Sequence, residues 1–243
     1  MDDTVQLDIQ RFNPETGQVP YWQTFEVPAE PGDPVLAALM RVREEQDGSL
    51  AFRASCRSGI CGSDGMVING WPRLACKTQI SEVQDAHGII RIQPLFNLPR
   101  LKDLVVDQTP FWDKFSAVFP WLMPAVDKPE PEKERRMQME PDDFQLLSKA
   151  SDCIFCQICF AACPIVGLDQ EFLGPQALIK AYRFEADPRD AGTPTRAPVL
   201  DDPEGVWRCR TIFNCTEACP KGIPITRGIQ VLKRAMVQEE LRR

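Results

Sequence analysis

Ten cysteines are the residues of this chain best suited to chemistry, and they fall in three groups. The groups are Cys56, Cys61 and Cys76; Cys153, Cys156, Cys159 and Cys163; and Cys209, Cys215 and Cys219. Thiolates are soft donors for metals, and short regular intervals are typical of metal ligands. Cysteines that serve only as small buried hydrophobes need no such intervals. A disulfide framework suits small secreted domains, whereas this chain has 243 residues and no visible secretory signal, so we expect reduced thiols.

The second group has the spacing of bacterial ferredoxins, Cys153-x2-Cys156-x2-Cys159-x3-Cys163, followed by Pro164. Runs of this kind bind iron–sulfur clusters, and in two-cluster ferredoxins the fourth cysteine reaches the other cluster. A zinc site could use the first two cysteines, but it would leave the rest unexplained. We therefore interpret the run as a set of iron–sulfur ligands.

The third group repeats this spacing with one substitution. In Cys209-x2-Ile212-x2-Cys215-x3-Cys219-Pro220, an isoleucine stands where a ferredoxin would place its second cysteine. If the fourth cysteine of each run binds the cluster of the other run, as in two-cluster ferredoxins, the thiolates divide into two sets. One set, Cys153, Cys156, Cys159 and Cys219, suits a 4Fe–4S cluster; the other is Cys163, Cys209 and Cys215. Because isoleucine does not bind iron, the second set predicts a 3Fe–4S cluster; the alternative is a 4Fe–4S cluster whose last iron takes water or another ligand.

The first group has the spacing of plant-type ferredoxins, with a carboxylate in the third position: Cys56-x4-Cys61-x2-Asp64-x11-Cys76. A carboxylate binds ferric iron, although it is a harder donor than a thiolate. Either Asp64 is the fourth ligand of a 2Fe–2S cluster, which we favour, or it is a loop residue and the ligand comes from elsewhere. Glycines at positions 59, 62 and 65 would let the backbone wrap tightly and turn its amides toward the sulfurs.

The elements predicted around the first group are those of a small sheet on a helix. Strands are expected over residues 5–9, 21–27, 65–68, 73–76 and 89–92. The turn-prone pair Asn69-Gly70 predicts a hairpin between the third and fourth of them. A helix is expected over residues 34–46, with an apolar face of Val35, Leu36, Leu39, Met40 and Val42. This pattern predicts a plant-ferredoxin-like β-grasp.

The remainder of the chain is predicted to be helical. Residues 127–136 are charged, proline-bearing and nearly free of apolar side chains, which is typical of a linker. Gly174-Pro175 opens a helix to Ala186, and another spans residues 225–241 with Ile229, Leu232, Val237 and Leu241 on its buried face. The fold class predicted is α+β: residues 1–105 as the 2Fe–2S domain, residues 106–142 as a connecting helix and linker, and residues 143–243 as an all-helical, bacterial-ferredoxin-like domain.

Composition excludes several classes of function. A net charge of −7 argues against nucleic acid as a partner, because phosphate binding needs a basic face. No uninterrupted apolar run reaches about 18 residues, so the chain is not expected to span a membrane by itself. The single histidine, His87, leaves no histidine-based acid–base relay, and no Gly-x-Gly-x-x-Gly fingerprint indicates FAD binding by this chain.

A plant-type site followed by a bacterial-type pair that lacks one cysteine resembles the iron–sulfur subunits of the succinate:quinone oxidoreductase family. The resemblance covers nearly the whole chain. Its supporting stretches are Ser55-Cys56-Arg57, Cys61-Gly62-Ser63-Asp64-Gly65, Leu74-Ala75-Cys76-Lys77, Asp103-Leu104-Val105-Val106-Asp107 and Trp207-Arg208-Cys209. Some members of the family share the aspartate at the position of Asp64 and still assemble the 2Fe–2S cluster.

The resemblance implies a subunit of a succinate dehydrogenase or fumarate reductase. Electrons would pass between an FAD-containing flavoprotein subunit and a quinone through 2Fe–2S, 4Fe–4S and 3Fe–4S clusters. The chain would lie on the cytoplasmic face of the inner or plasma membrane, bound through a membrane anchor subunit.

Four residues, Pro164, Ile165, Arg210 and Ile212, align with family positions that border the quinone. Gly167-Leu168 replaces a tryptophan usual in ubiquinone users, which favours menaquinone, and the direction of the reaction stays open. The alternative function is a free soluble multi-cluster carrier, or the iron–sulfur arm of a different dehydrogenase.

Overall fold

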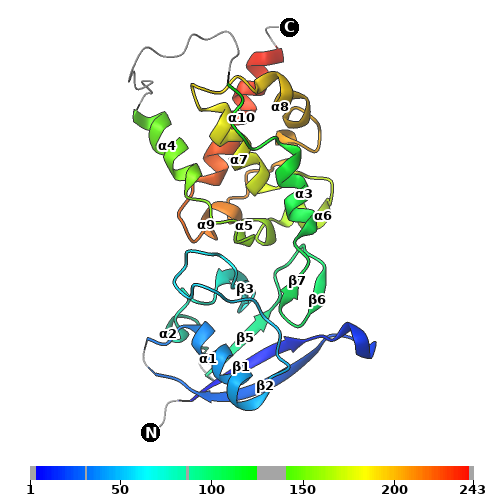
Figure 1. Cartoon of the computed structure of the whole chain (residues 1–243), viewed down its shortest axis with the longest axis vertical. Coiled ribbons are helices and arrows are strands. Elements are labelled where there is room, and N and C mark those ends of the chain that lie inside the picture. Colours follow the sequence, from blue (N-terminus) through cyan, green and yellow to red (C-terminus); the bar gives the residue numbers. More distant parts are fainter. Residues whose placement is uncertain (1–3, 31, 86–87, 125–140, 241–243) are drawn as a thin grey trace. The chain divides into compact units, whose positions relative to one another are not determined.

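The structure is a computed structural model that describes residues 4–30, 32–85, 88–124 and 141–240. The predicted linker segment at residues 127–136 and His87 lie outside the described residues. The chain divides into two compact units, whose elements are labelled in Figure 1. The first unit is Met1–Pro110 with Ile154–Ala162, and the second is Phe111–Cys153 with Cys163–Arg243.

A five-stranded mixed sheet, in the order β2-β1-β5-β3-β4, forms most of the first unit. Its strands are β1 (Thr4–Arg11), β2 (Tyr21–Pro28), β3 (Gly65–Ile68), β4 (Trp71–Leu74) and β5 (Ile89–Gln93). β1 pairs antiparallel with β2 and parallel with β5. The predicted alternation in β1 is confirmed, because Val5, Leu7 and Ile9 are fully buried on one face of the strand.

The predicted hairpin is confirmed at Asn69-Gly70, where both residues have positive φ, of 49° and 78°. The predicted bounds of its second strand are wrong. β4 begins at Trp71, directly after the turn, because a two-residue turn leaves no residue between it and the strand. Cys76 therefore lies in the turn that follows β4.

Short helical elements complete the first unit. These are a 3-10 turn (Pro14–Thr16), α1 (Val35–Arg41) continued by a π-helical turn (Val42–Gln46), α2 (Ile80–Val83) and α5 (Ile158–Ala161). Four residues of the predicted apolar face of the first helix are buried, and the fifth, Met40, is half-buried. A second small sheet of β6 (Arg100–Lys102) and β7 (Val105–Val106) was not predicted, since strands this short carry no detectable periodicity.

The second unit is helical. Its elements are α3 (Thr109–Ala117, whose first two residues belong to the first unit), α4 (Pro141–Ser151), α6 (Pro164–Leu168), α7 (Pro175–Glu185), α8 (Thr193–Leu200), a 3-10 turn (Val206–Arg208), α9 (Asn214–Glu217) and α10 (Ile225–Glu240). α7 begins as predicted, with Gly174 as its N-cap and Pro175 in its first turn. Among the described residues, no helix combines the length and the apolar character that a membrane span requires.

The buried face of α10 is confirmed in part. Ile225, Ile229, Leu232 and Met236 are almost fully buried, at the intervals of one helix face. Val237, also predicted on this face, is 43% exposed, because it is turned about 100° from Met236 around the helix axis. The last predicted member, Leu241, lies outside the described residues.

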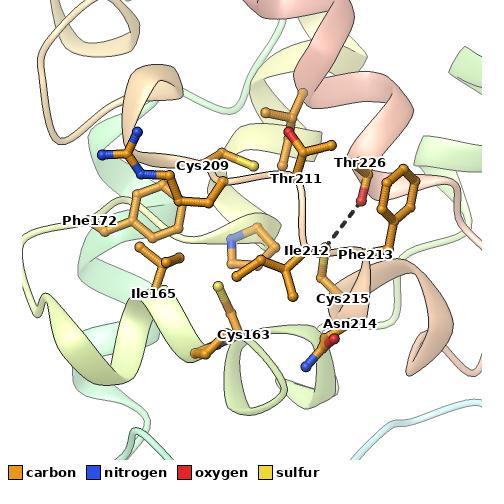
Figure 2. A pocket seen from close by; sticks show the side chains of 14 residues that line it. Cys163, Ile165, Phe172, Cys209, Thr211, Ile212, Phe213, Asn214, Cys215 and Thr226 are labelled. Atoms are coloured by element: carbon orange, nitrogen blue, oxygen red, sulfur yellow. Dashed lines mark hydrogen bonds between the residues drawn. The ribbon is translucent and has the colours of Figure 1, made fainter.

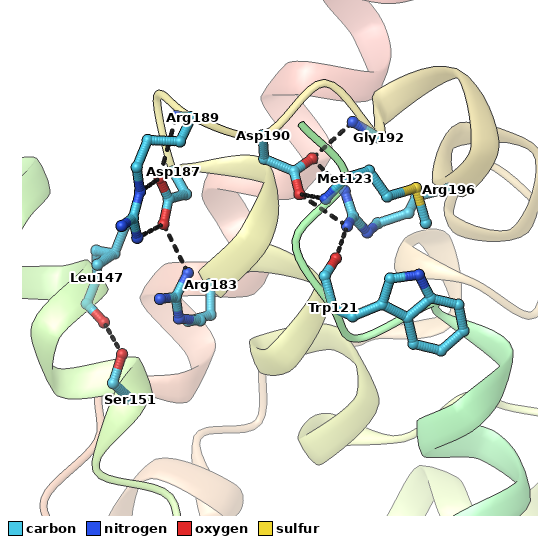
Figure 3. Close-up of polar contacts among 10 residues, drawn as sticks. All are labelled: Trp121, Met123, Leu147, Ser151, Arg183, Asp187, Arg189, Asp190, Gly192 and Arg196. Carbon is cyan, nitrogen blue, oxygen red and sulfur yellow. Dashed lines mark hydrogen bonds and ion pairs between the residues drawn. The ribbon is translucent and has the colours of Figure 1, made fainter. Parts of the chain in front are cut away.

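A buried ion network joins α7 and α8 to residues 121–123, which follow α3 in the chain (Figure 3). Arg196 is fully buried and donates to the carboxylates of Asp190 and Glu185 at 2.7 and 3.1 Å. It also donates to the carbonyl of Trp121 at 2.6 Å, while Asp190 accepts the backbone N–H of Met123 at 3.0 Å. The guanidinium of Arg196 therefore binds the loop between α7 and α8 to Trp121, which lies 75 residues before Arg196 in the sequence.

We expect Arg196→Met to lower the free energy of unfolding by about 3–5 kcal/mol, because it leaves two buried carboxylates without their cation. Chemical denaturation at neutral pH, followed by circular dichroism, measures the effect. The matched control is Lys149→Met at the exposed pair of Lys149 with Asp152, where about 0–1 kcal/mol is expected. A loss at Arg196 no larger than that of the control would contradict this role for the network.

Candidate metal centres

In the loop at residues 56–65, several backbone N–H groups converge on the sulfur of Cys56. The N–H groups of Ser58, Ile60 and Cys61 point at Cys56 Sγ from 3.4, 3.4 and 3.2 Å. These donors, that of Ser58 first, lower the pKa of the Cys56 thiol from 9.0 to about 6. Converging backbone amides of this kind favour an anion and recur at iron–sulfur sites.

Asp64, near the end of this loop, and Cys76, in the turn after β4, are both buried and contact each other. Asp64 is 2% exposed, and its carboxylate accepts the backbone N–H of Cys76 at 2.6 Å. Burial is the main reason that the pKa of the Cys76 thiol is raised to about 12, followed by the hydrogen bond with Asp64. The charge of the Cys56 thiolate raises this pKa further. The structure thus brings together the residues predicted for the 2Fe–2S site, while ligation by Asp64 itself stays a prediction.

Glycines of this loop serve two different purposes. Gly59 and Gly62 have φ of 71° and 70°. Residues with a side chain rarely adopt these backbone angles, and glycines are expected at such positions in a tightly wrapped loop. Gly65 lies outside the left-handed region, but a Cβ there would lie 2.8 Å from the carbonyl oxygen of Cys156. A Cβ on Gly62 would lie equally close, at 2.8 Å, to the Cβ of Cys156. The first cysteine loop therefore packs directly against the segment that carries Cys156.

The two bacterial-type runs share one local backbone conformation. In each run, the residues just before and just after the second ligand position lie in the left-handed region, and a short helix, α5 or α9, follows. The left-handed residues are Phe155 and Gln157 around Cys156, and Thr211 and Phe213 around Ile212, with φ between 55° and 72°. Such non-glycine residues cost about 1–3 kcal/mol each, so their repetition at the same offsets indicates that both runs require the same backbone shape. Ile212 occupies the backbone position that Cys156 has in the other run.

A hollow of about 350 Å³ in the second unit gathers the three-thiolate set (Figure 2). Cys163, Cys209 and Cys215 line it, and so does Ile212, which is 46% exposed. The residues predicted to border a quinone, Pro164, Ile165, Arg210 and Ile212, all line this same hollow. Spacing predicted that Cys163, Cys209 and Cys215 meet, across segments far apart in the chain, whereas the four quinone residues came from the family resemblance and their role stays a prediction.

Two thiols of this hollow, those of Cys163 and Cys215, are desolvated by burial. Burial raises the pKa of the Cys163 thiol, and it raises that of Cys215 to about 11. Iron binds the thiolate, so loading this site would release protons that the iron-free chain retains at neutral pH. A soft, anionic donor set in an apolar hollow fits an iron–sulfur cluster.

The four-thiolate set stays a prediction from the sequence. Cys156 and Cys159 belong to the first unit, whereas Cys153 and Cys219 belong to the second. Within the described ranges, no three His, Cys, Asp or Glu side chains gather closely enough for a single metal ion. The thiolates of a cluster of several irons stand further apart than the ligands of one zinc ion.

Seven residues that sequence reasoning did not assign to this site also line the hollow: Phe172, Pro175, Thr211, Phe213, Asn214, Thr226 and Ile229. Thr226 contacts Cys215 through its hydroxyl, although the two are 11 residues apart in the sequence. No spacing rule connects a threonine in one helix to a cysteine in another, so the sequence offers no signal for this contact.

Comparison with known proteins agrees with this geometry. Residues 6–113 match the family model described as a 2Fe–2S iron–sulfur cluster binding domain, and residues 149–223 match the 4Fe–4S dicluster domain. The chain is 38% identical over 243 residues to the fumarate reductase iron–sulfur subunit of Mycobacterium tuberculosis, with 100% of this chain and 97% of that protein covered. The chain belongs to the family of succinate dehydrogenase and fumarate reductase iron–sulfur subunits.

A second relative and a solved structure are also similar to this chain over nearly its whole length. The succinate dehydrogenase iron–sulfur subunit of Paracoccus denitrificans is 40% identical over 233 residues, with 95% of this chain and 87% of that protein covered. A solved chain of the Mycobacterium smegmatis Sdh1 complex in the apo form superposes with a TM-score of 0.86 at 26% identity, covering 99% of this chain and 98% of that one. The predicted family and the α+β fold class are confirmed: a ferredoxin-like mixed-sheet domain precedes a helical dicluster domain.

In the iron-free chain, we expect Cys56 to be alkylated first. Its pKa of about 6 leaves it mainly as thiolate at neutral pH, whereas Cys76 and Cys215, with pKa values of about 12 and 11, stay protonated. The thiolate is the nucleophile, so lowering the pH from about 7 to about 5 should slow labelling of Cys56 about tenfold. Limited iodoacetamide labelling with peptide mass spectrometry measures the order. The control is the same chain in urea, where all thiols should react alike; native Cys215 reacting as fast as Cys56 would contradict the geometry.

Proposed function

We propose that this subunit holds three clusters in series and carries single electrons between an FAD-containing flavoprotein subunit and a membrane quinone. The proposed ligands are Cys56, Cys61, Asp64 and Cys76 for the 2Fe–2S cluster; Cys153, Cys156, Cys159 and Cys219 for the 4Fe–4S cluster; and Cys163, Cys209 and Cys215 for the 3Fe–4S cluster. The observation that carries the proposal is the repeated backbone of the two bacterial-type runs, with Ile212 at the position of Cys156. When bound, each cluster accepts and releases one electron at a time. The two electrons of a flavin reaction would therefore pass between the flavin and the quinone in single steps.

The residues of the first loop support a docking role toward the flavoprotein subunit. Cys56 and Cys61 are exposed, and the side chain of Ile60 beside them is 63% exposed. The amides of Ser58 and Ile60 hold the sulfur of Cys56 in place without closing it off from a partner. A short exposed loop around an electron carrier lets a partner's cofactor approach closely.

The residues around the three-thiolate hollow support a role at the quinone end. We propose that Pro164, Ile165, Arg210 and Ile212 border the quinone. Leu168 beside them is 83% exposed, and Phe213 is exposed as well, which gives this face an apolar surface for a membrane anchor subunit. Gly167-Leu168 favours menaquinone. Through the anchor, the subunit would lie peripherally on the cytoplasmic face of the inner or plasma membrane.

Low-temperature electron paramagnetic resonance (EPR) of the anaerobic complex tests the proposal. We expect the signal of an oxidised three-iron cluster before reduction and the signal of a reduced two-iron cluster after it. The decisive variant is Ile212→Cys, which places a fourth thiolate at the empty ligand position and should convert the three-iron cluster to a cube. Its oxidised three-iron signal should then be lost.

The matched control is Ile212→Val, which keeps an apolar side chain and should keep the three-iron signal. A three-iron signal of full intensity in Ile212→Cys would show that the ligands around this site are assigned wrongly. A preparation of the unsubstituted complex with no three-iron signal would overturn the proposed set of clusters.

A further inference from the structure

Thr226 borders the three-thiolate hollow and contacts one of its cysteines (Figure 2). Its hydroxyl Oγ1 lies 3.6 Å from Cys215 Sγ, and the residue is 1% exposed. Cys215 is buried too, so water does not compete for this contact, and a hydrogen bond in such surroundings is stronger than one on the surface. Thr226 is the second residue of α10, and the helix fixes its backbone.

A second threonine orients the hydroxyl of the first. Thr216 Oγ1 accepts the backbone N–H of Thr226 at 3.0 Å, and it lies 2.9 Å from Thr226 Oγ1. An iron-bound thiolate has no proton and acts only as an acceptor. With Cys215 in that state, the Thr226 hydroxyl can only donate to it. The Thr216 side chain also hydrogen-bonds Cys215, with Thr226 having the larger effect on the pKa of that thiol, so the two hydroxyls form a pair beside the sulfur.

Cys163, a second cysteine of the hollow, has donors of a different kind. The backbone N–H groups of Ile165 and Val166 donate to Cys163, so the main chain supplies these bonds whatever the side chains are. The bond from Thr226 to Cys215 comes from a side chain, so a single substitution removes it.

We propose that Thr226 is a positioning residue that raises the midpoint potential of the three-iron cluster by donating a hydrogen bond to Cys215. This inference rests on the proposed 3Fe–4S cluster. Hydrogen bonds to sulfur are among the factors that set cluster potentials. Reduction adds negative charge to the cluster and its thiolates, which strengthens the bond. The donor therefore favours the reduced form and makes the last carrier a better acceptor for electrons that arrive through the chain.

A purely structural reading of the same contacts makes a different prediction. The bond from Thr226 N–H to Thr216 also satisfies a donor in the first turn of α10, and such bonds stabilise a helix. If that were the whole role of the pair, removing the Thr216 hydroxyl would change stability, and removing either hydroxyl would leave the potential where it is. The potential is therefore the quantity to measure.

The experiment is a redox titration of the intact complex, with the three-iron EPR signal as the readout. Thr226→Val keeps the shape and removes the donor; we expect the reduction equilibrium to weaken about tenfold, which lowers the midpoint by about 59 mV. Thr226→Ser keeps the hydroxyl and should titrate like the unsubstituted complex. Thr216→Val should shift the midpoint less, in the same direction. The matched control is Thr193→Val, whose hydroxyl donates to Glu185 and touches no cysteine, and whose midpoint should not move.

Two outcomes distinguish a failure of this inference from a failure of the proposed 3Fe–4S cluster. A full three-iron signal in Thr226→Val with an unchanged midpoint overturns the inference and leaves the three-iron cluster standing. A missing three-iron signal in the unsubstituted complex overturns the cluster itself. Should Thr226→Val lose the cluster during purification, the midpoint of Thr216→Val decides, and an unshifted value there also overturns the inference.

Discussion

The backbone conformation that encloses the sulfurs is the constraint on which the rest of this structure depends. Amides converge on a sulfur only if a short loop alternates between right- and left-handed residues. This chain adopts left-handed φ at Arg57, Phe155, Gln157, Thr211 and Phe213, of which two are aromatic and one is β-branched. Bulky residues rarely adopt this conformation, at about 1–3 kcal/mol each, so the surrounding structure must hold them there.

The sheet and the helices provide that restraint in different ways. In the first unit, Gly62 and Gly65 let the first cysteine loop pack against the segment with Cys156, so two cysteine-bearing segments stabilise each other. In the second, two residues of α10 hold the loop of the third cysteine group: Gln230 donates to the hydroxyl of Thr211 at 2.9 Å, and Lys233 donates to the carbonyl of Cys209 at 2.8 Å. Metal binding would complete this restraint, because iron displaces protons from thiols such as Cys215, and its binding free energy then favours the folded loops.

Much of the site could be predicted from the sequence, since ligand spacing is a local property. The meeting of Cys163 with Cys209 and Cys215 follows from the crossed pattern of paired runs. The fold was predictable where periodicity is long: β1 and α10 were placed correctly, but Val237 was assigned to the wrong side of the helix. β6 and β7 are too short for any pattern. The contact of Thr226 with Cys215 joins two helices and depends on packing, which no local spacing encodes.

The central claim is that Ile212 leaves one corner of a cube without a ligand, so that the third cluster lacks an iron. The most direct measurement is the amount of iron and acid-labile sulfide per chain in the anaerobically purified complex, after haem iron is determined separately and subtracted. The account predicts about nine irons and about ten sulfides per chain. About ten irons with about ten sulfides would mean that the third cluster is a complete cube, and would contradict it.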